Sequence, residues 1–301
     1  MRHPLKIWRD SADRLSILRI VTLACLCAPL LKAFYDADAI VHGARPIDNL
    51  IHRAGFWAII FLLVALAVSP LRRVGRFNQL LDVRRMIGVG VFFYVAAHFL
   101  LFIVDQMFDL TKVASEIIFR VYLTIGFVAL LGMTALAVTS TDGMVRRLGT
   151  KRWQRLHQAI YVIALLALIH FFQQNKSEVS VPTLAAGLFT WMIGYRILIK
   201  LRNSREEPPT WMLFALTVVV SALTFAGEAI GLGIVFHVSP WRVLATAFDF
   251  DPDAIRPGWL VFAAGLCVVV LDFVRARYAK PRRPARPTPA AVPAGAGKRA
   301  A

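Results

Sequence analysis

Cysteine is scarce in this chain, and its three cysteines offer neither a metal site nor a disulfide framework. Cys25, Cys27 and Cys267 all lie within apolar runs, and no Cys-x-x-Cys pair or cluster of cysteine with histidine occurs. The spacing excludes the common zinc and iron–sulfur motifs and a fold held together by disulfides. Any chemistry must therefore rest on other side chains.

Long soluble segments are also missing. No stretch between apolar runs exceeds about 25 residues, and no glycine-rich dinucleotide fingerprint lies between a strand and a helix. Gly88 and Gly90 lie inside an apolar run and are predicted to be helix-packing positions. The chain thus has no domain of its own for NAD(P)H or FAD, so if it moves electrons, both donor and acceptor are other molecules.

Apolar runs make up most of the chain. It is 58% hydrophobic, with a mean hydropathy of +0.61, above the apolar fraction of soluble domains. Each run has the length of a membrane-crossing helix, and lipid leaves the backbone no other hydrogen-bonding solution. The pattern predicts an all-α, polytopic membrane helix bundle of about eight transmembrane helices. The runs are Leu15–Tyr35, Ile51–Val68, Met86–Asp105, Ile117–Val138, Leu156–Phe172, Val181–Ile199, Trp211–Phe236 and Gly258–Arg277.

Charge alternates along the loops between these runs. The net charge of +17 comes from Lys and Arg in alternate loops and at both ends of the chain, whereas the intervening loops are neutral or acidic. Such a bias marks the cytoplasmic side, so both termini are predicted to be cytoplasmic. Basic residues confined to loops argue against nucleic acid as a partner. The basic, Pro- and Ala-rich tail from Ala279 is predicted to be disordered and to contact membrane lipids.

Two of these runs carry the three histidines on which a cofactor site is predicted: His98 on the third run, and His157 and His170 on the fifth. His157 and His170 are thirteen residues apart, about 20 Å along a helix. His98 lies thirteen residues beyond Arg85, at the basic start of the third run, just as His170 lies thirteen residues beyond His157 at the basic start of the fifth. The two runs are parallel, so His98 and His170 are predicted to lie at the same depth in the membrane. Two imidazoles at one level are predicted to clamp a b-type haem and fill both axial positions, which suits electron transfer. The alternative is that each histidine hydrogen-bonds within the bundle.

Other ionisable residues carry weaker predictions. His157 lies opposite Arg84 and Arg85, with no second histidine near; a second haem, a propionate or flavin phosphate, a quinone and a purely interfacial role beside Trp153 all stay open. Arg120 is predicted either to neutralise a haem propionate or to extend to the interface. His52, at the start of the second run, could reach a haem propionate or a partner, but a solvated loop histidine is favoured. Glu228 lies inside the seventh run and is predicted to be paired or protonated.

Four segments between His52 and Gln173 resemble the haem-binding membrane subunits of bacterial periplasmic methionine sulfoxide reductase systems (MsrQ/YedZ type), in the ferric-reductase-like transmembrane group. The segments are HRAGFWAIIFLLVALAVSPLRR, RRMIGVGVFFYVAAHFLLFI, RVYLTIGFVALLGMTALAVTS and MVRRLGTKRWQRLHQAIYVIALLALIH. In that family the histidines matching His98, His157 and His170 are haem ligands or candidates for that role. Two departures stand out: the chain adds a seventh and an eighth run, and the family's Arg-Pro-Tyr reads Arg120-Val121-Tyr122 here.

The resemblance implies a relay. One or two b haems, with FMN as a further cofactor, would carry electrons from a quinone or a cytosolic flavin reductase to a periplasmic molybdopterin-containing reductase subunit that repairs oxidised methionine. It divides the chain into a first helix and loop (1–50), a haem-binding core (51–200), two additional helices (201–278) and the tail (279–301). The alternatives are a stand-alone ferric or quinone reductase and a non-redox transporter or structural subunit.

Overall fold

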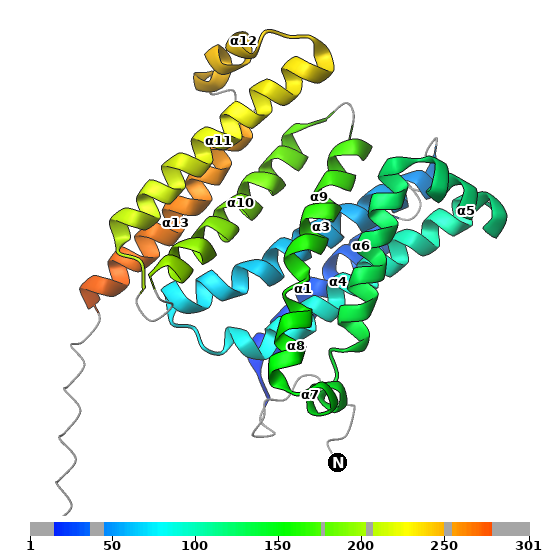
Figure 1. The fold of residues 1–301 in the computed structure, drawn as a ribbon, viewed down its shortest axis with the longest axis horizontal. Helices are drawn as coiled ribbons and strands as arrows, with labels where there is room; N and C mark the ends of the chain where they lie inside the picture. Colours follow the sequence, from blue (N-terminus) through cyan, green and yellow to red (C-terminus); the bar gives the residue numbers. More distant parts are fainter. Residues whose placement is uncertain (1–14, 37–44, 176–177, 203–206, 250–254, 279–301) are drawn as a thin grey trace, which may run out of the picture.

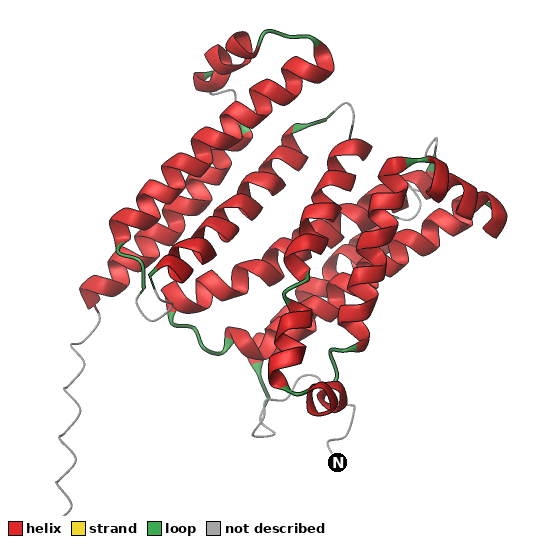
Figure 2. Cartoon of the chain, in the orientation of Figure 1, coloured by secondary structure: helices red, strands yellow, loops and turns green. Residues whose placement is uncertain are grey.

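The computed structural model describes residues 15–36, 45–175, 178–202, 207–249 and 255–278. Within these ranges the regular elements are helices (Figure 2), and eight spans are long and apolar enough to cross a membrane. The all-α prediction and the count of eight spans are thus confirmed. The tail from Ala279 and the N-terminal basic cluster lie outside the described residues.

Six spans are single helices that begin and end within a few residues of the predicted limits, except that α3 and α4 extend about one to two turns further. The added turns carry the polar residues of the loops, such as Asp48 and Arg72. These helices are α1 (Ile17–Tyr35), α3 (Pro46–Gly75), α4 (Leu80–Asp105), α10 (Ser180–Leu201), α11 (Thr210–Phe236) and α13 (Pro257–Tyr278). Short α12 (Pro240–Ala245) and a 3-10 turn (Thr246–Phe248) cover the end of the α11–α13 pair (Figure 1).

The fourth and fifth spans differ from the prediction. The fourth was predicted to begin at Ile117, but the chain is extended at Arg120 (φ −112°, ψ 104°), which separates α5 (Leu110–Phe119) from α6 (Val121–Val138). Arg120 therefore joins two helices and does not lie within one. After α7 (Asp142–Leu148), the fifth span is interrupted after His157, which ends α8 (Thr150–His157), and resumes as α9 (Ile160–Gln174).

The helices form two groups. In the first, α3 packs along α4 and α6 along α9, and α4 also contacts α6; in the second, α10, α11 and α13 pack on one another. Half-buried Arg196 of α10 joins the groups. Its guanidinium donates to the carbonyl of Leu66 (2.6 Å) and to the hydroxyl of Tyr161 (3.0 Å), so α10 is tied to both α3 and α9. The charge is satisfied by oxygen atoms, as burial requires.

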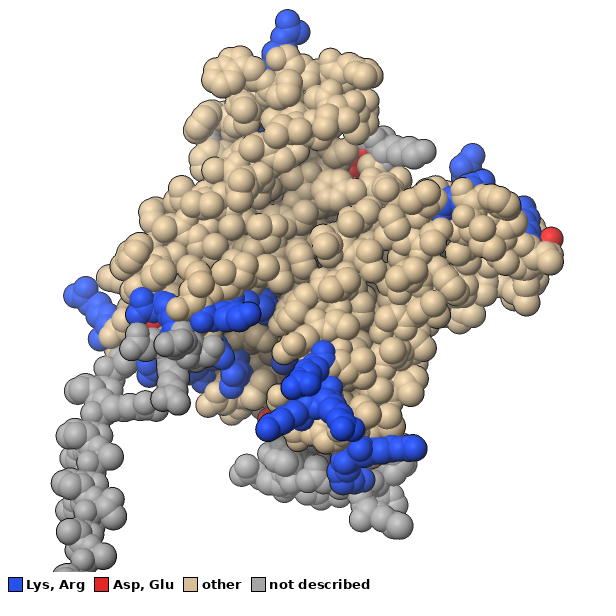
Figure 3. Space-filling model, viewed as in Figure 1, with Lys and Arg blue, Asp and Glu red and all other residues tan. Residues whose placement is uncertain are grey.

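Lys and Arg gather at one end of the bundle (Figure 3). Eight crossings bring the start of α1 and the end of α13 to this same end. We call it the basic end; the other is the opposite end. The basic end includes Arg72, Arg73, Arg84, Arg85, Arg146, Arg147, Lys151, Arg152, Arg155, Lys200, Arg202, Arg275 and Arg277.

Asp109 begins α5 at the opposite end. Its carboxylate accepts hydrogen bonds from the Thr111 hydroxyl and from the backbone N–H of Lys112 (3.0 Å), and these bonds lower its pKa. A lowered pKa means that the cap stabilises α5 above pH 3.8 and that this stabilisation is lost as the pH falls through the folded-state value. We expect Asp109→Ala to speed amide hydrogen exchange in the first turn of α5 at neutral pH. Asp109→Asn, which keeps an acceptor, should restore slow exchange and remove its acid dependence.

Candidate functional site

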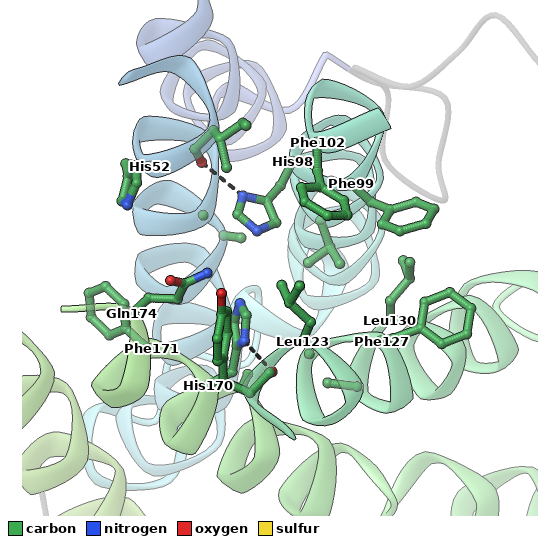
Figure 4. A pocket seen from close by; sticks show the side chains of 18 of the residues that line it. His52, His98, Phe99, Phe102, Leu123, Phe127, Leu130, His170, Phe171 and Gln174 are labelled. Carbon is green, nitrogen blue, oxygen red and sulfur yellow. Dashed lines mark hydrogen bonds between the residues drawn. The ribbon is translucent and has the colours of Figure 1, made fainter. Parts of the chain in front are cut away.

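A cavity of about 680 Å³ opens among α3, α4, α6 and α9 in the half of the bundle near the opposite end. This volume falls within the range of about 300–1,000 Å³ typical of cofactor pockets. Aromatic and aliphatic side chains form its walls (Figure 4), including a Phe99–Phe127 contact with ring centres 5.7 Å apart. Its volume and largely apolar lining suit a large hydrophobic group.

His98 and His170 project into this cavity from α4 and α9. Their ring centres lie 6.2 Å apart, with an angle of 80° between the ring planes, and the rings point toward each other across the cavity (Figure 4). The structure therefore brings together the two histidines that were predicted to share one depth. Their distance is informative because an imidazole nitrogen binds a transition metal at about 2.0 Å and lies about 1.1 Å from its ring centre. Two imidazoles on opposite sides of one ion thus have centres about 6 Å apart.

Each of these histidines hydrogen-bonds through the same ring nitrogen. Nδ1 of His98 lies 2.8 Å from the carbonyl oxygen of Ile51, and Nδ1 of His170 lies 2.8 Å from that of Tyr122. A carbonyl only accepts, so Nδ1 carries the hydrogen in both rings. Nε2 is then the nitrogen with a free lone pair, and a backbone carbonyl that fixes the tautomer in this way is the usual support of a metal-ligating histidine.

The mouth of the cavity, at the opposite end, is polar. Three cations reach it: Arg53 at the start of α3, Lys112 of α5 and Arg120 between α5 and α6. Arg120 donates to the hydroxyl of Tyr122 (3.2 Å) and pairs with Glu116, and both interactions raise its pKa, so it stays charged. Uncharged and acidic side chains complete this rim, namely Asp48, His52, Asp105, Gln106, Glu116, Gln174 and Asn175.

His157 lies away from this cavity, at the end of α8. Its ring stacks on Trp153 with centres 3.9 Å apart, Nδ1 lies 3.1 Å from the Trp153 carbonyl, and Nε2 lies 3.3 Å from the Ser140 hydroxyl. Both ring nitrogens thus have oxygen neighbours from the protein.

Other predicted residues differ from the sequence expectation only in part. His52 is solvated, as favoured, with 51% of its side chain exposed, but it lies on helix α3 and not in a loop, at the rim of the cavity with Nδ1 2.8 Å from the Asp48 carbonyl oxygen. Glu228 is paired, as predicted, but its partner is Arg256 (3.0 Å), a residue that no pattern singled out. Arg196 was missed altogether, although an arginine within an apolar run is a signal in itself.

The protein combines a membrane helix bundle with a cavity into which two histidines project face to face. This combination is the basis for comparing it with known families of membrane proteins. Residues 54–168 match the model of the ferric reductase like transmembrane component family. Within that class the chain belongs to the family of protein-methionine-sulfoxide reductase heme-binding subunits, MsrQ. The matched segment includes His98 and His157 and ends just before His170.

The similarity to MsrQ relatives extends over more than half of this chain. The chain is 39% identical over 202 residues to the Rhodospirillum rubrum protein, across 66% of this chain and 93% of the relative. It is 44% identical over 174 residues to that of Herminiimonas arsenicoxydans (57% and 79%), and 41% over 164 residues to that of Xanthomonas euvesicatoria (54% and 75%). No solved structure matches the chain.

Proposed function

We propose that this protein is a haem b electron-transfer subunit of a methionine sulfoxide reductase system. The observation that carries the proposal is the placement of His98 and His170, whose rings face each other at the separation expected for two axial ligands of one iron. The relatives named as heme-binding subunits support it. A bound haem would supply one-electron transfer between two oxidation states of its iron.

The residues present fit such a group. His98 and His170 would hold the iron, each through Nε2, since Nδ1 is engaged with a carbonyl. The phenylalanines and leucines of the walls would cover an apolar macrocycle, and Arg53, Lys112 and Arg120 at the rim would meet its carboxylates. Two histidine ligands leave no axial position for oxygen or a substrate, which is why we assign electron transfer and not catalysis to this subunit.

The charge distribution supports an orientation for the protein. With the basic end in the cytoplasm of a bacterial inner membrane, both termini are cytoplasmic and the mouth of the cavity faces the periplasm. Electrons would leave there toward a periplasmic molybdopterin-containing reductase subunit. They would enter from a quinol or a cytosolic flavin reductase on the side of His157. The charges of Arg84 and Arg85 also suit the phosphate of FMN at that end.

The additional helices form a separate part in this proposal. Residues lining the haem cavity run from Asp48 to Val181, so α11 and α13 contribute none of them. We assign residues 51–200 to the haem-binding core and 201–278 to an added helix pair that packs on α10. One haem is proposed, because His157 lacks a facing histidine among the described residues and has oxygen neighbours at both nitrogens.

A redox titration of the purified, full-length protein, monitored by absorbance, tests this proposal. We expect a Soret band that sharpens on reduction and a single titration step, corresponding to one haem. A colourless protein from haem-supplemented cells would overturn the proposal, and two steps would require a second haem. Reduction of a soluble iron or quinone acceptor by this subunit alone, without a periplasmic partner, would instead identify a stand-alone reductase.

A further inference from the structure

Each of the two facing histidines packs against a glycine of a neighbouring helix. A Cβ atom built on Gly55 of α3 would lie 3.1 Å from both Cε1 and Nδ1 of His98. A Cβ atom on Gly126 of α6 would lie 2.8 Å from Nδ1 and 2.9 Å from Cε1 of His170. Contacts below 3.0 Å are essentially never seen for real Cβ atoms. His170 therefore occupies space that a Cβ atom on Gly126 would need. The 3.1 Å contacts at Gly55 are tighter than nine in ten real Cβ contacts, so a Cβ atom there would require His98 to shift by a few tenths of an ångström.

The two contacts have the same construction. The carbonyl that accepts from His98 belongs to Ile51, four residues before Gly55; the one that accepts from His170 belongs to Tyr122, four residues before Gly126. In an α-helix, the N–H of residue i+4 bonds the carbonyl of residue i, so the side chain of residue i+4 lies beside that carbonyl. An imidazole that reaches the same carbonyl from another helix must cross the position of that side chain. Glycine leaves it open.

We propose that Gly55 and Gly126 are positioning residues that seat His98 and His170 on their carbonyls and so set the nearly perpendicular ring planes of the two haem ligands. The inference rests on the proposed function, because it assigns a role toward the haem. It goes beyond that function in naming two cavity-lining residues that act through the histidines and are not themselves ligands. It also explains why two histidines on different helices have the same tautomer and a defined rotation.

The hydrogen bond between each histidine and its backbone carbonyl would affect a bound iron. A hydrogen bond from Nδ1–H to a carbonyl makes the imidazole a more basic ligand, which favours the oxidised metal. Displacing a ring from its carbonyl should therefore raise the midpoint potential of the haem. The low-spin ferric EPR spectrum of a bis-imidazole haem also depends on the angle between the ring planes. The 80° angle predicts a highly anisotropic signal, which should become less anisotropic when a ring is free to turn.

The experiment compares four alanine variants of the full-length protein. Gly55→Ala and Gly126→Ala crowd the histidines, whereas Gly90→Ala crowds the flexible end of Leu26, at 2.8 Å, and Gly88→Ala meets nothing within 4 Å. Gly88 and Gly90 lie on α4, the helix that carries His98, so they are matched controls for a packing defect. The sequence predicts both Gly88 and Gly90 as helix-packing positions. Gly90 packs against Leu26, whereas no atom lies within 4 Å of a Cβ built on Gly88.

We expect Gly55→Ala and Gly126→Ala to raise the potential and to alter the ferric EPR signal, with the larger change in Gly126→Ala because its contacts are closer. Both Gly55 and Gly126 line the cavity, so the deciding readout is the angle between the ligand planes seen by EPR, and not haem content. Gly55→Ala, with contacts at 3.1 Å, is the milder variant if Gly126→Ala fails to accumulate. Wild-type potential and EPR in Gly55→Ala, or equal changes in Gly90→Ala, would overturn the inference. A wild-type protein without haem would instead refute the proposed function.

Discussion

His98→Ala is expected to lower the haem content of the purified protein at least about tenfold, and His170→Ala to do the same. Removing a residue that merely supports a metal ligand costs about 10–100-fold in affinity, so removing a ligand should cost no less. The two variants should behave alike, because the rings face one cavity from opposite sides. The measurement is the Soret absorbance per protein after expression with excess haem precursor.

His157→Ala is the matched comparison. It removes a histidine from the same span as His170 but outside the cavity, so we expect the spectrum to be retained. Free imidazole added to His98→Gly or His170→Gly should restore part of the low-spin spectrum, since it can enter the space left by the ring. Full haem content in His98→Ala would remove the basis of the assignment. Loss of half of the haem in His157→Ala would show that a second haem binds there.

Arg256→Ala is expected to destabilise the α11–α13 pair by about 2–3 kcal/mol. Breaking a buried ion pair from one side costs about 3–5 kcal/mol, and we place this pair lower because the Arg256 side chain is 25% exposed. Glu228 has 2% of its side chain exposed, so it would remain in the membrane without its guanidinium partner. The free energy of unfolding in detergent measures the loss. The haem spectrum should not change, since neither helix lines the cavity.

The double variant Arg256→Ala/Glu228→Gln separates an unpaired charge from a loss of packing. Removing the charge of Glu228 should recover most of the stability, because the penalty arises from the carboxylate that remains. Arg76→Ala is the control: its pair with Glu207 is 4.0 Å long and has side chains 58% and 48% exposed, so the loss should be below about 1 kcal/mol. Equal losses in the single and double variants would show that Arg256 acts through packing alone.

Hydropathy and charge in the sequence predict much of this fold. Eight apolar runs of sufficient length become eight helices because a membrane leaves the backbone no other choice, and alternate basic loops lie at one end of the bundle. The relative depth of His98 and His170 also follows from the sequence. Rise per residue is constant along a helix, so equal spacing from two basic interfaces predicts an equal level.

Which atoms meet across the bundle was decided by tertiary structure alone. The sequence carries the period of each helix but not its rotation against its neighbours, so neither the carbonyls of Ile51 and Tyr122 nor the glycines beside them could be recognised as the seats of two histidines. The extended residue at Arg120 has no proline or glycine within five residues on either side in this chain, so its break between two helices is not indicated by these residues themselves. The Glu228–Arg256 pair joins residues far apart in the chain. Depth in the membrane is a property of one helix, whereas a site is made by the packing of several.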